Sequence, residues 1–202
     1  MAEENKTNET LEEDSSNESE ENEELKAALG LKDKEKFETV LAYVLSKQAT
    51  DDVILIDKGF DDGLKQDMPV ITSNGILIGK IKTCFNNFSQ VALITAKDFA
   101  FDIKVQITEQ EETVALAKGL GGMRLALDFA SKEKEIKPGN PVFTVALGAN
   151  FPKGLLVGEI ESVQKNDAEL FQTGLIKPYF PDYFSGGLFV IKNFLSLQQQ
   201  SQ

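Results

Sequence analysis

Three carboxylates in one short segment are the first residues whose types and spacing could do chemistry. Asp57, Asp61 and Asp62 lie in DKGFDDG, and oxygen-rich segments of this kind can bind calcium. An EF-hand loop needs a longer series of ligands that ends in a bidentate acid, and none follows here at that spacing. Asp and Gly are also the residues of tight turns. We therefore interpret the segment as a turn, and we predict no metal site and no cofactor.

Serine side chains could act as nucleophiles only with a base beside them. The chain has no histidine, which removes the commonest general base and the middle member of a Ser-His-Asp triad. No Ser-x-x-Lys motif lies on an expected helix to supply a lysine base instead. We therefore predict no catalytic residue and no enzyme activity. The serines considered are Ser46, Ser73, Ser89 and Ser185.

Two further motifs are more simply explained by structure. The single cysteine, Cys84, allows no intrachain disulfide and no Cys/His zinc site of ordinary spacing. The glycine run 119–122 (GLGG) precedes MRLALDF, which has the alternation of a strand, whereas phosphate loops open a helix. We expect a hairpin turn there.

The acidity of the chain is concentrated at its N-terminus. The formal net charge is −12, and residues 1–35 hold 13 acidic and 4 basic side chains, against 20 and 17 in the remainder. A nearly neutral body has no field to attract phosphates, so we do not expect nucleic acid as a partner. The sequence contains no run of about 20 apolar residues and no signal peptide. We expect a soluble chain, with any membrane anchor lying outside it.

The ends of the chain differ from its body. Residues 1–22 are too polar to fold alone, so we expect a disordered acidic segment, either an interaction tail or a solvated leader. Residues 23–36 predict a short helix with Leu25 and Leu29 on one face. Such a helix needs a partner, either the body or a second copy in a coiled coil. Residues 193–202 form a polar tail.

The body consists of short β-type segments separated by Gly, Pro, Asn and Asp. About a dozen such segments, with no helical period of useful length between them, predict an all-β sandwich or barrel. The expected strands are FETVLAYVLS, DVILID, PVITS, GILIGKIKTC, SQVALIT, DIKVQI, TVALAKG, MRLALDF, PVFTVA, GLLVGEIESV, LFQTGLIKP and GLFVIK.

An internal repeat refines this prediction. Each copy has a strand ending in Asp, then a Lys-x-x-x-Pro-Val segment, then a strand with two glycines four residues apart. The second of these glycines is where a strand can bend or bulge to close a small barrel. We therefore predict two tandem barrels, at residues 37–96, with the C-terminal strands as a possible completion, and at 97–192. The matching blocks are 53–57 with 124–128, 64–72 with 136–144, and 75–81 with 154–160.

These blocks resemble the rod shape-determining MreC family. The resemblance rests on the order of EELKAALGL, LIDKGFDDGLKQDMPVITSNGILIGKI, IKPGNPVFTVALGANFPKGLLVGEIESV and KPYFPDYFSGGLFVI. It implies two small β-barrels arranged as in trypsin-type proteases, a dimerising helix before them and, in full-length members, a transmembrane anchor. It also implies a scaffold of cell-wall elongation and rod shape on the extracytoplasmic face of the membrane. The implied partners are other copies of the chain, as dimer or filament, a penicillin-binding transpeptidase and other membrane proteins of the elongation complex.

Aromatic residues are the candidate contact residues, together with Leu25 and Leu29. The densest cluster contains Tyr179, Phe180, Tyr183 and Phe184, and it could anchor a partner or seal the two barrels together. The same two interpretations apply to Phe85, Phe88, Phe99 and Phe101. The alternatives to a scaffold are a protease-like double-barrel hydrolase without a histidine base and an oligomer with no role in the envelope.

Overall fold

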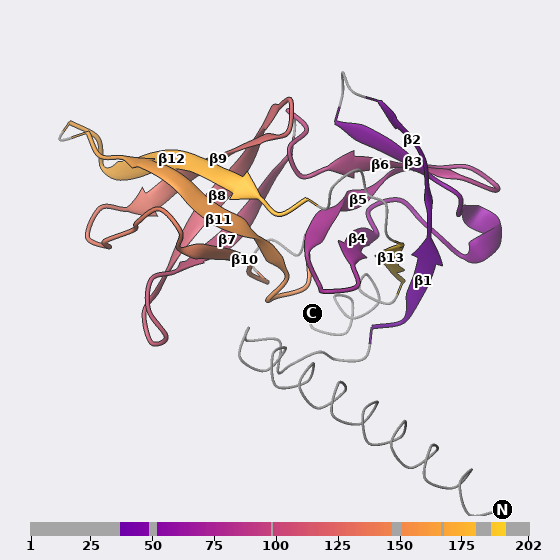
Figure 1. Cartoon of the computed structure of the whole chain (residues 1–202), viewed down its shortest axis with the longest axis horizontal. Helices are drawn as coiled ribbons and strands as arrows, with labels where there is room; N and C mark the ends of the chain where they lie inside the picture. The colour runs from indigo at the N-terminus through magenta and orange to yellow at the C-terminus, as the bar shows by residue number, and fades with distance from the viewer. Residues whose placement is uncertain are drawn as a thin grey trace, which may run out of the picture. The chain divides into compact units, whose positions relative to one another are not determined.

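A computed structural model describes residues 37–48, 52–97, 99–146, 151–166, 168–180 and 187–192. These residues form thirteen strands and one 3₁₀ turn, and no α-helix occurs among them (Figure 1). The all-β, two-barrel prediction is confirmed. The expected helix at 23–36, with Leu25 and Leu29, and the two tails lie outside the described residues.

The first set of strands forms a seven-stranded antiparallel sheet that is almost closed. Its order is β1-β13-β4-β5-β6-β3-β2. Its two edge strands, β1 and β2, follow each other in the sequence, so the chain itself passes from one edge of the sheet to the other. The strands are β1 (Thr39–Ala42), β2 (Val44–Gln48), β3 (Val53–Ile56), β4 (Pro69–Thr72), β5 (Leu77–Cys84), β6 (Ser89–Leu93) and β13 (Leu188–Ile191).

The first strand expected from the sequence forms two strands in the structure, β1 and β2. The segment FETVLAYVLS breaks at Tyr43, since the residues before it pair with β13 and those after it pair with β3. Asp57 fixes the break, because its carboxylate accepts the Tyr43 N–H at 2.7 Å while its own N–H donates to the Tyr43 carbonyl at 3.0 Å. A continuous apolar pattern does not reveal such a break.

The second set of strands forms a closed six-stranded barrel, in which each strand pairs with a neighbour on both sides. Its order around the barrel is β10-β11-β12-β9-β8-β7. The strands are β7 (Ala100–Gln106), β8 (Glu112–Gly121), β9 (Arg124–Ser131), β10 (Pro141–Thr144), β11 (Leu156–Gln164) and β12 (Phe171–Pro178). Figure 1 shows these six strands grouped together, apart from the seven of the first sheet.

The internal repeat is confirmed in the strand order and in the register. The series β4-β5-β6-β3 of the first barrel matches β10-β11-β12-β9 of the second. Val70 pairs with Gly79 and Val142 with Gly158, and in both copies the register shifts at the next residue. A side chain at either glycine would meet a backbone carbonyl: a Cβ would lie 1.9 Å from the Ala92 oxygen or 2.1 Å from the Lys177 oxygen. The repeated glycines thus mark the bulges that curve the two sheets.

Two clusters of buried hydrophobic residues fill the barrels, and one of them extends across the junction. On β4, Val70 belongs to the cluster of the first barrel, whereas Ile71 belongs to that of the second. On β13, Val190 and Ile191 divide in the same way. Because side chains alternate between the two faces of a strand, the outer face of the first barrel packs against the second.

Candidate interaction site at the junction of the barrels

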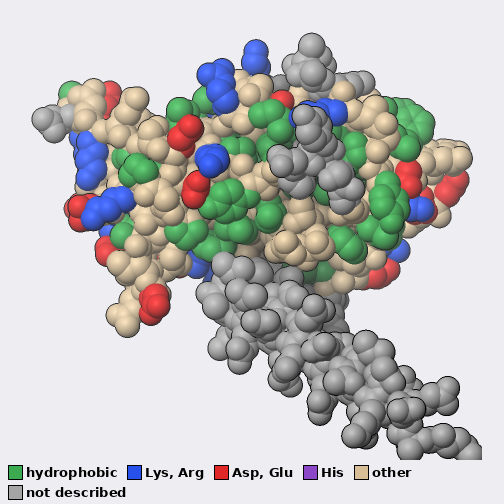
Figure 2. Space-filling model, in the orientation of Figure 1, with side chains coloured by type: hydrophobic (Ala, Val, Ile, Leu, Met, Phe, Trp, Pro, Cys, Tyr) green, Lys and Arg blue, Asp and Glu red, His purple; other side chains and the backbone are tan. Residues whose placement is uncertain are grey.

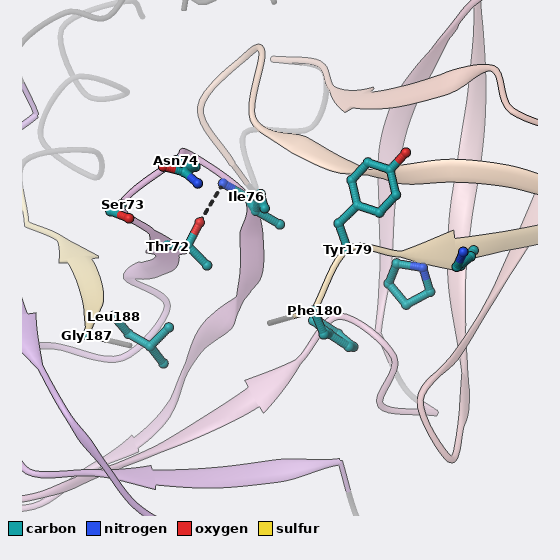
Figure 3. Close-up of a pocket in the computed structure, with 10 residues that line it drawn as sticks. Thr72, Ser73, Asn74, Ile76, Tyr179, Phe180, Gly187 and Leu188 are labelled. Carbon is teal, nitrogen blue, oxygen red and sulfur yellow. Dashed lines mark hydrogen bonds between the residues drawn. The ribbon is translucent and has the colours of Figure 1, made fainter. Parts of the chain in front are cut away.

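A pocket of about 410 Å³ lies at the junction of the barrels. One side is the turn from Thr72 to Ile76 with Leu188, and the other is the end of β12 with Tyr179 and Phe180 (Figure 3). The turn is held by the Thr72 hydroxyl, which accepts the Ile76 N–H at 3.2 Å. The lining is mostly apolar, with Ser73, Asn74 and Lys177 as polar groups, and such a pocket can accept a side chain of another molecule.

Tyr179 is held in place at the pocket by its neighbours. Its N–H donates to the Val157 carbonyl at 3.0 Å, and its hydroxyl donates to a carboxylate oxygen of Glu159 at 2.8 Å. In Figure 3 the hydroxyl points away from the turn at Thr72, so the ring rather than the hydroxyl lines the pocket. Lys177 approaches the other oxygen of Glu159 at 3.4 Å.

These contacts shift both titrations. Burial, and then the hydrogen bond to Glu159, raises the pKa of Tyr179 to about 12. The same hydrogen bond, with a smaller effect of Lys177, lowers the pKa of Glu159. The phenol therefore stays neutral and the carboxylate charged at physiological pH. A fixed aromatic ring beside a fixed charge suits recognition more than proton transfer.

The other aromatic residue of the pocket connects the two cores. Phe180 is half buried and packs against the hydrophobic clusters of both barrels. This position agrees with the interpretation of the aromatic cluster as a seal between the barrels, and Phe180 lines the pocket together with Tyr179. Tyr183 and Phe184 lie outside the described residues.

The four other candidate aromatic residues separate into two pairs. Phe99 and Phe101 are buried and pack against Phe151, with ring centroids 5.8 and 5.3 Å away. They belong to the core. Phe85 and Phe88 stack on each other at 4.5 Å and remain exposed on the β5–β6 turn.

The carboxylates of DKGFDDG are used within the fold. Asp57 accepts the Tyr43 N–H, and Asp62 accepts the Gly59 N–H at 3.0 Å and pairs with Lys58 at 3.3 Å. The Gly59 hydrogen bond is the main cause that lowers the pKa of Asp62. Within the described ranges, no group of three or more Cys, Asp and Glu could hold a metal ion.

The remaining candidate residues also have structural positions. The hydroxyl of Ser89 donates to the Lys58 carbonyl at 2.7 Å, and Ser46 and Ser73 are exposed. Gly119 to Gly122 span the end of β8 and the hairpin turn to β9, as expected. Ser185 lies outside the described residues.

One set of exposed apolar residues, on the outer face of the closed barrel, was not predicted from the sequence. Phe129 on β9 contacts Phe171 on β12 edge-on at 5.5 Å, and Leu170 beside them is 84% exposed. Alternation from Leu125 and Leu127 would place Phe129 inside the barrel. A bulge in β9 turns Phe129 outward, and nothing in the sequence pattern predicts this bulge. Figure 2 shows hydrophobic side chains among charged ones over both barrels.

The comparison with protein families decides the identity of the fold. The family model described as "Rod shape-determining protein MreC, barrel core" matches residues 44–192, which is most of the chain. The chain belongs to the MreC family. The cell shape-determining protein MreC of Listeria monocytogenes is 33% identical over 163 residues, covering 78% of this chain and 55% of that protein. The chain thus spans about half the length of this MreC relative.

Solved MreC structures agree with the fold. A Listeria monocytogenes MreC structure is 31% identical, with a TM-score of 0.69, and covers 93% of this chain and 91% of that one. The fold alone is shared with MreC in a complex with penicillin-binding protein PBP2 from Helicobacter pylori, at 17% identity, a TM-score of 0.60 and coverage of 77% and 97%. Another solved structure is the major periplasmic domain of the "cell shape-determining filament MreC", at 19% identity, a TM-score of 0.64 and coverage of 76% and 95%.

The transmembrane anchor that the family resemblance implies would need a long apolar helix. In the described part of the chain, no helix has the length and hydrophobicity to cross a bilayer. The expected coiled coil would begin in residues that the structure does not describe.

Proposed function

We propose that this chain is the barrel part of a non-catalytic scaffold of cell-wall elongation and rod shape. The observation that carries the proposal is the family match over residues 44–192, which takes in both barrels except β1. Proteins named cell shape-determining are its relatives, and the candidate nucleophiles and carboxylates in the described ranges have structural roles or lack a base. Rigid barrels with variable loops suit docking rather than turnover.

The partners we propose are a penicillin-binding transpeptidase and further copies of the chain. The Helicobacter pylori MreC was solved in a complex with PBP2, and another solved MreC is described as a filament. The part of that filament protein with the shared fold is called its major periplasmic domain, which supports the extracytoplasmic face of the membrane as the location. Tyr179 is the candidate contact residue at the pocket, because its ring is fixed and faces the cavity.

A binding measurement with purified proteins tests this function. We expect the chain to bind the extracytoplasmic domain of the elongation transpeptidase from the same bacterium, and to show no hydrolase activity toward reactive serine and lysine probes. The body 37–202, compared with the whole chain, shows whether the segment with Leu25 and Leu29 adds self-association. Probe labelling that a competing substrate prevents would instead favour the protease-like alternative.

A further inference from the structure

One exposed residue of the closed barrel adopts a backbone conformation that its side chain does not favour. Phe129 has a φ of 53°, in the left-handed region, and its side chain is 54% exposed. A bulky residue is rarely found there, and glycine is the usual residue where a bulge enters this region. The Asp128 carboxylate accepts the Phe129 N–H at 2.9 Å, which supports the backbone but does not need the ring.

The bulge exposes the ring of Phe129 to solvent. Gln172 pairs with Ala130 and Gly174 pairs with Leu127, so Asp128 and Phe129 together oppose the single residue Thr173. Ala130 takes the inward position that Phe129 would have had in a regular strand. The strained backbone and the exposed ring of Phe129 both lower the stability of the fold. Strained residues and exposed apolar side chains are found preferentially at functional surfaces.

The ring belongs to an apolar row on the outer face of β8, β9 and β12. Phe171 and Leu175 project from this face of β12, and Leu175 pairs with Ala126 of β9. Leu170 extends the row at the start of β12, and Val114 is exposed on β8. We call these five large side chains, Val114, Phe129, Leu170, Phe171 and Leu175, the outer apolar row.

The charges beside the outer apolar row indicate the kind of partner. Lys118 lies across from Ala126, and Arg124 starts β9; both are exposed, and neither has an ion pair among the residues the structure describes. The strands of this face in a second copy would bring no free carboxylate to them, and the exposed Glu169 lies in the loop before β12 rather than on a strand. The acids of these three strands are Glu112, paired with Lys104, and Asp128, bonded to the Phe129 N–H.

We propose that the outer apolar row is a docking surface for the penicillin-binding transpeptidase, which would place there an apolar segment flanked by carboxylates. This inference rests on the proposed function and adds the surface and its chemistry. Aromatic side chains and arginine contribute most of the binding energy of many interfaces, and unpaired cations beside them favour an acidic partner.

The test is binding of the whole chain to the extracytoplasmic domain of the transpeptidase from the same bacterium. Asn tolerates the left-handed region, so Phe129→Asn keeps the bulge and removes the ring. We expect it to weaken binding by roughly 10- to 100-fold, as at other aromatic anchors, while the denaturant midpoint stays equal or rises. Leu170→Ser, at an 84% exposed position, should also weaken binding without unfolding. Lys118→Glu with Arg124→Glu should slow association and reduce its salt dependence.

Phe88→Asn is the matched control, because Phe88 is an exposed, stacked aromatic residue of the other barrel. We expect its binding to be unchanged. If wild-type chain does not bind the transpeptidase, the proposed partner and this surface both fail. If wild type binds and Phe129→Asn binds equally well, only the surface is wrong. If the variant loses self-association and keeps transpeptidase binding, the row is an interface between copies, and the inference is overturned.

Discussion

Tyr179 and Glu159 form a side-chain pair in which each residue changes the proton affinity of the other. Tyr179 has its pKa raised to about 12, from an ordinary value of 10.0. Because the folded state favours the neutral phenol, the stability from this residue is complete below pH 10.0 and is lost as the pH rises through about 12. We expect an absorbance titration to show one of the three tyrosines ionising near pH 12, and Tyr179→Phe to remove that step.

The same pair predicts an effect at acidic pH. The hydrogen bond from Tyr179 is the main cause that lowers the pKa of Glu159. The stability that Glu159 contributes is therefore fully present above its pKa in the unfolded chain, and it is lost as the pH falls through its lower pKa in the folded chain. We expect Tyr179→Phe to raise the pKa of Glu159, measured by the carboxyl carbon shift in NMR. Lys177→Met is the control and should raise it less. An unchanged Glu159 titration in Tyr179→Phe would contradict the hydrogen bond.

At the scale of elements, the bulged strands β5 and β11 need glycine because backbone atoms of the neighbouring strand occupy the space that a side chain would fill. A Cβ at Gly79 or Gly158 would lie within about 2 Å of a carbonyl oxygen, and a carbonyl in a sheet cannot move aside. We expect Gly79→Ala and Gly158→Ala each to lower the free energy of unfolding by roughly 1–3 kcal/mol, the cost of overpacking. Urea unfolding measures this change.

Exposed positions on the same strands provide the controls. Lys82→Ala on β5 and Glu161→Ala on β11 should change the free energy of unfolding by less than about 0.5 kcal/mol, as is usual on the surface. If both glycine variants behave like these controls, the bulges can shift to admit a methyl group. In that case the repeated glycines would not explain the curvature of the barrels.

Strands and their repetition could be predicted from sequence because alternation and turn residues are local signals. The Pro-Val starts of β4 and β10 and the glycines of β5 and β11 recur in the same order, which predicts two similar sheets. The break at Tyr43 could not be predicted, because it depends on Asp57 of another strand. The outward turn of Phe129 depends on a bulge set by pairing with β12. Both are consequences of tertiary contacts.

The candidate site was predictable only in part for the same reason. Composition picked out Tyr179 and Phe180 as part of an aromatic cluster, but it could not divide their roles. Both residues line the pocket, but Phe180 also packs on both cores, whereas Tyr179 is held by its hydrogen bond to Glu159, twenty residues away in the chain. Exposure is a property of the folded surface, so Phe85 and Phe88 could not be separated from the buried Phe99 and Phe101.

At the scale of the whole molecule, the two barrels are joined by shared core and by backbone contacts. Ile76 bridges to Leu156 in parallel fashion, and the Leu156 N–H donates to the Gly75 carbonyl at 3.2 Å. On the hairpin between β8 and β9, the Gly121 N–H donates to the Thr95 carbonyl at 2.7 Å. Because one wall of the pocket comes from each barrel, these contacts fix the positions of the two walls relative to each other.

Asp52 is a buried acidic residue at this junction, and its removal tests how firmly the barrels are joined. Its side chain is only 3% exposed, and its carboxylate accepts the Met123 N–H at 3.2 and 3.3 Å. Asp52→Ala leaves that partly buried N–H without its acceptor, so we expect the free energy of unfolding to fall by roughly 1–3 kcal/mol and hydrogen exchange at Met123 to become faster. Asp52→Asn keeps an acceptor oxygen and tolerates the φ of 48°. It should remain close to wild type. Equal losses in the two variants would mean that the charge of Asp52, rather than this hydrogen bond, stabilises the junction.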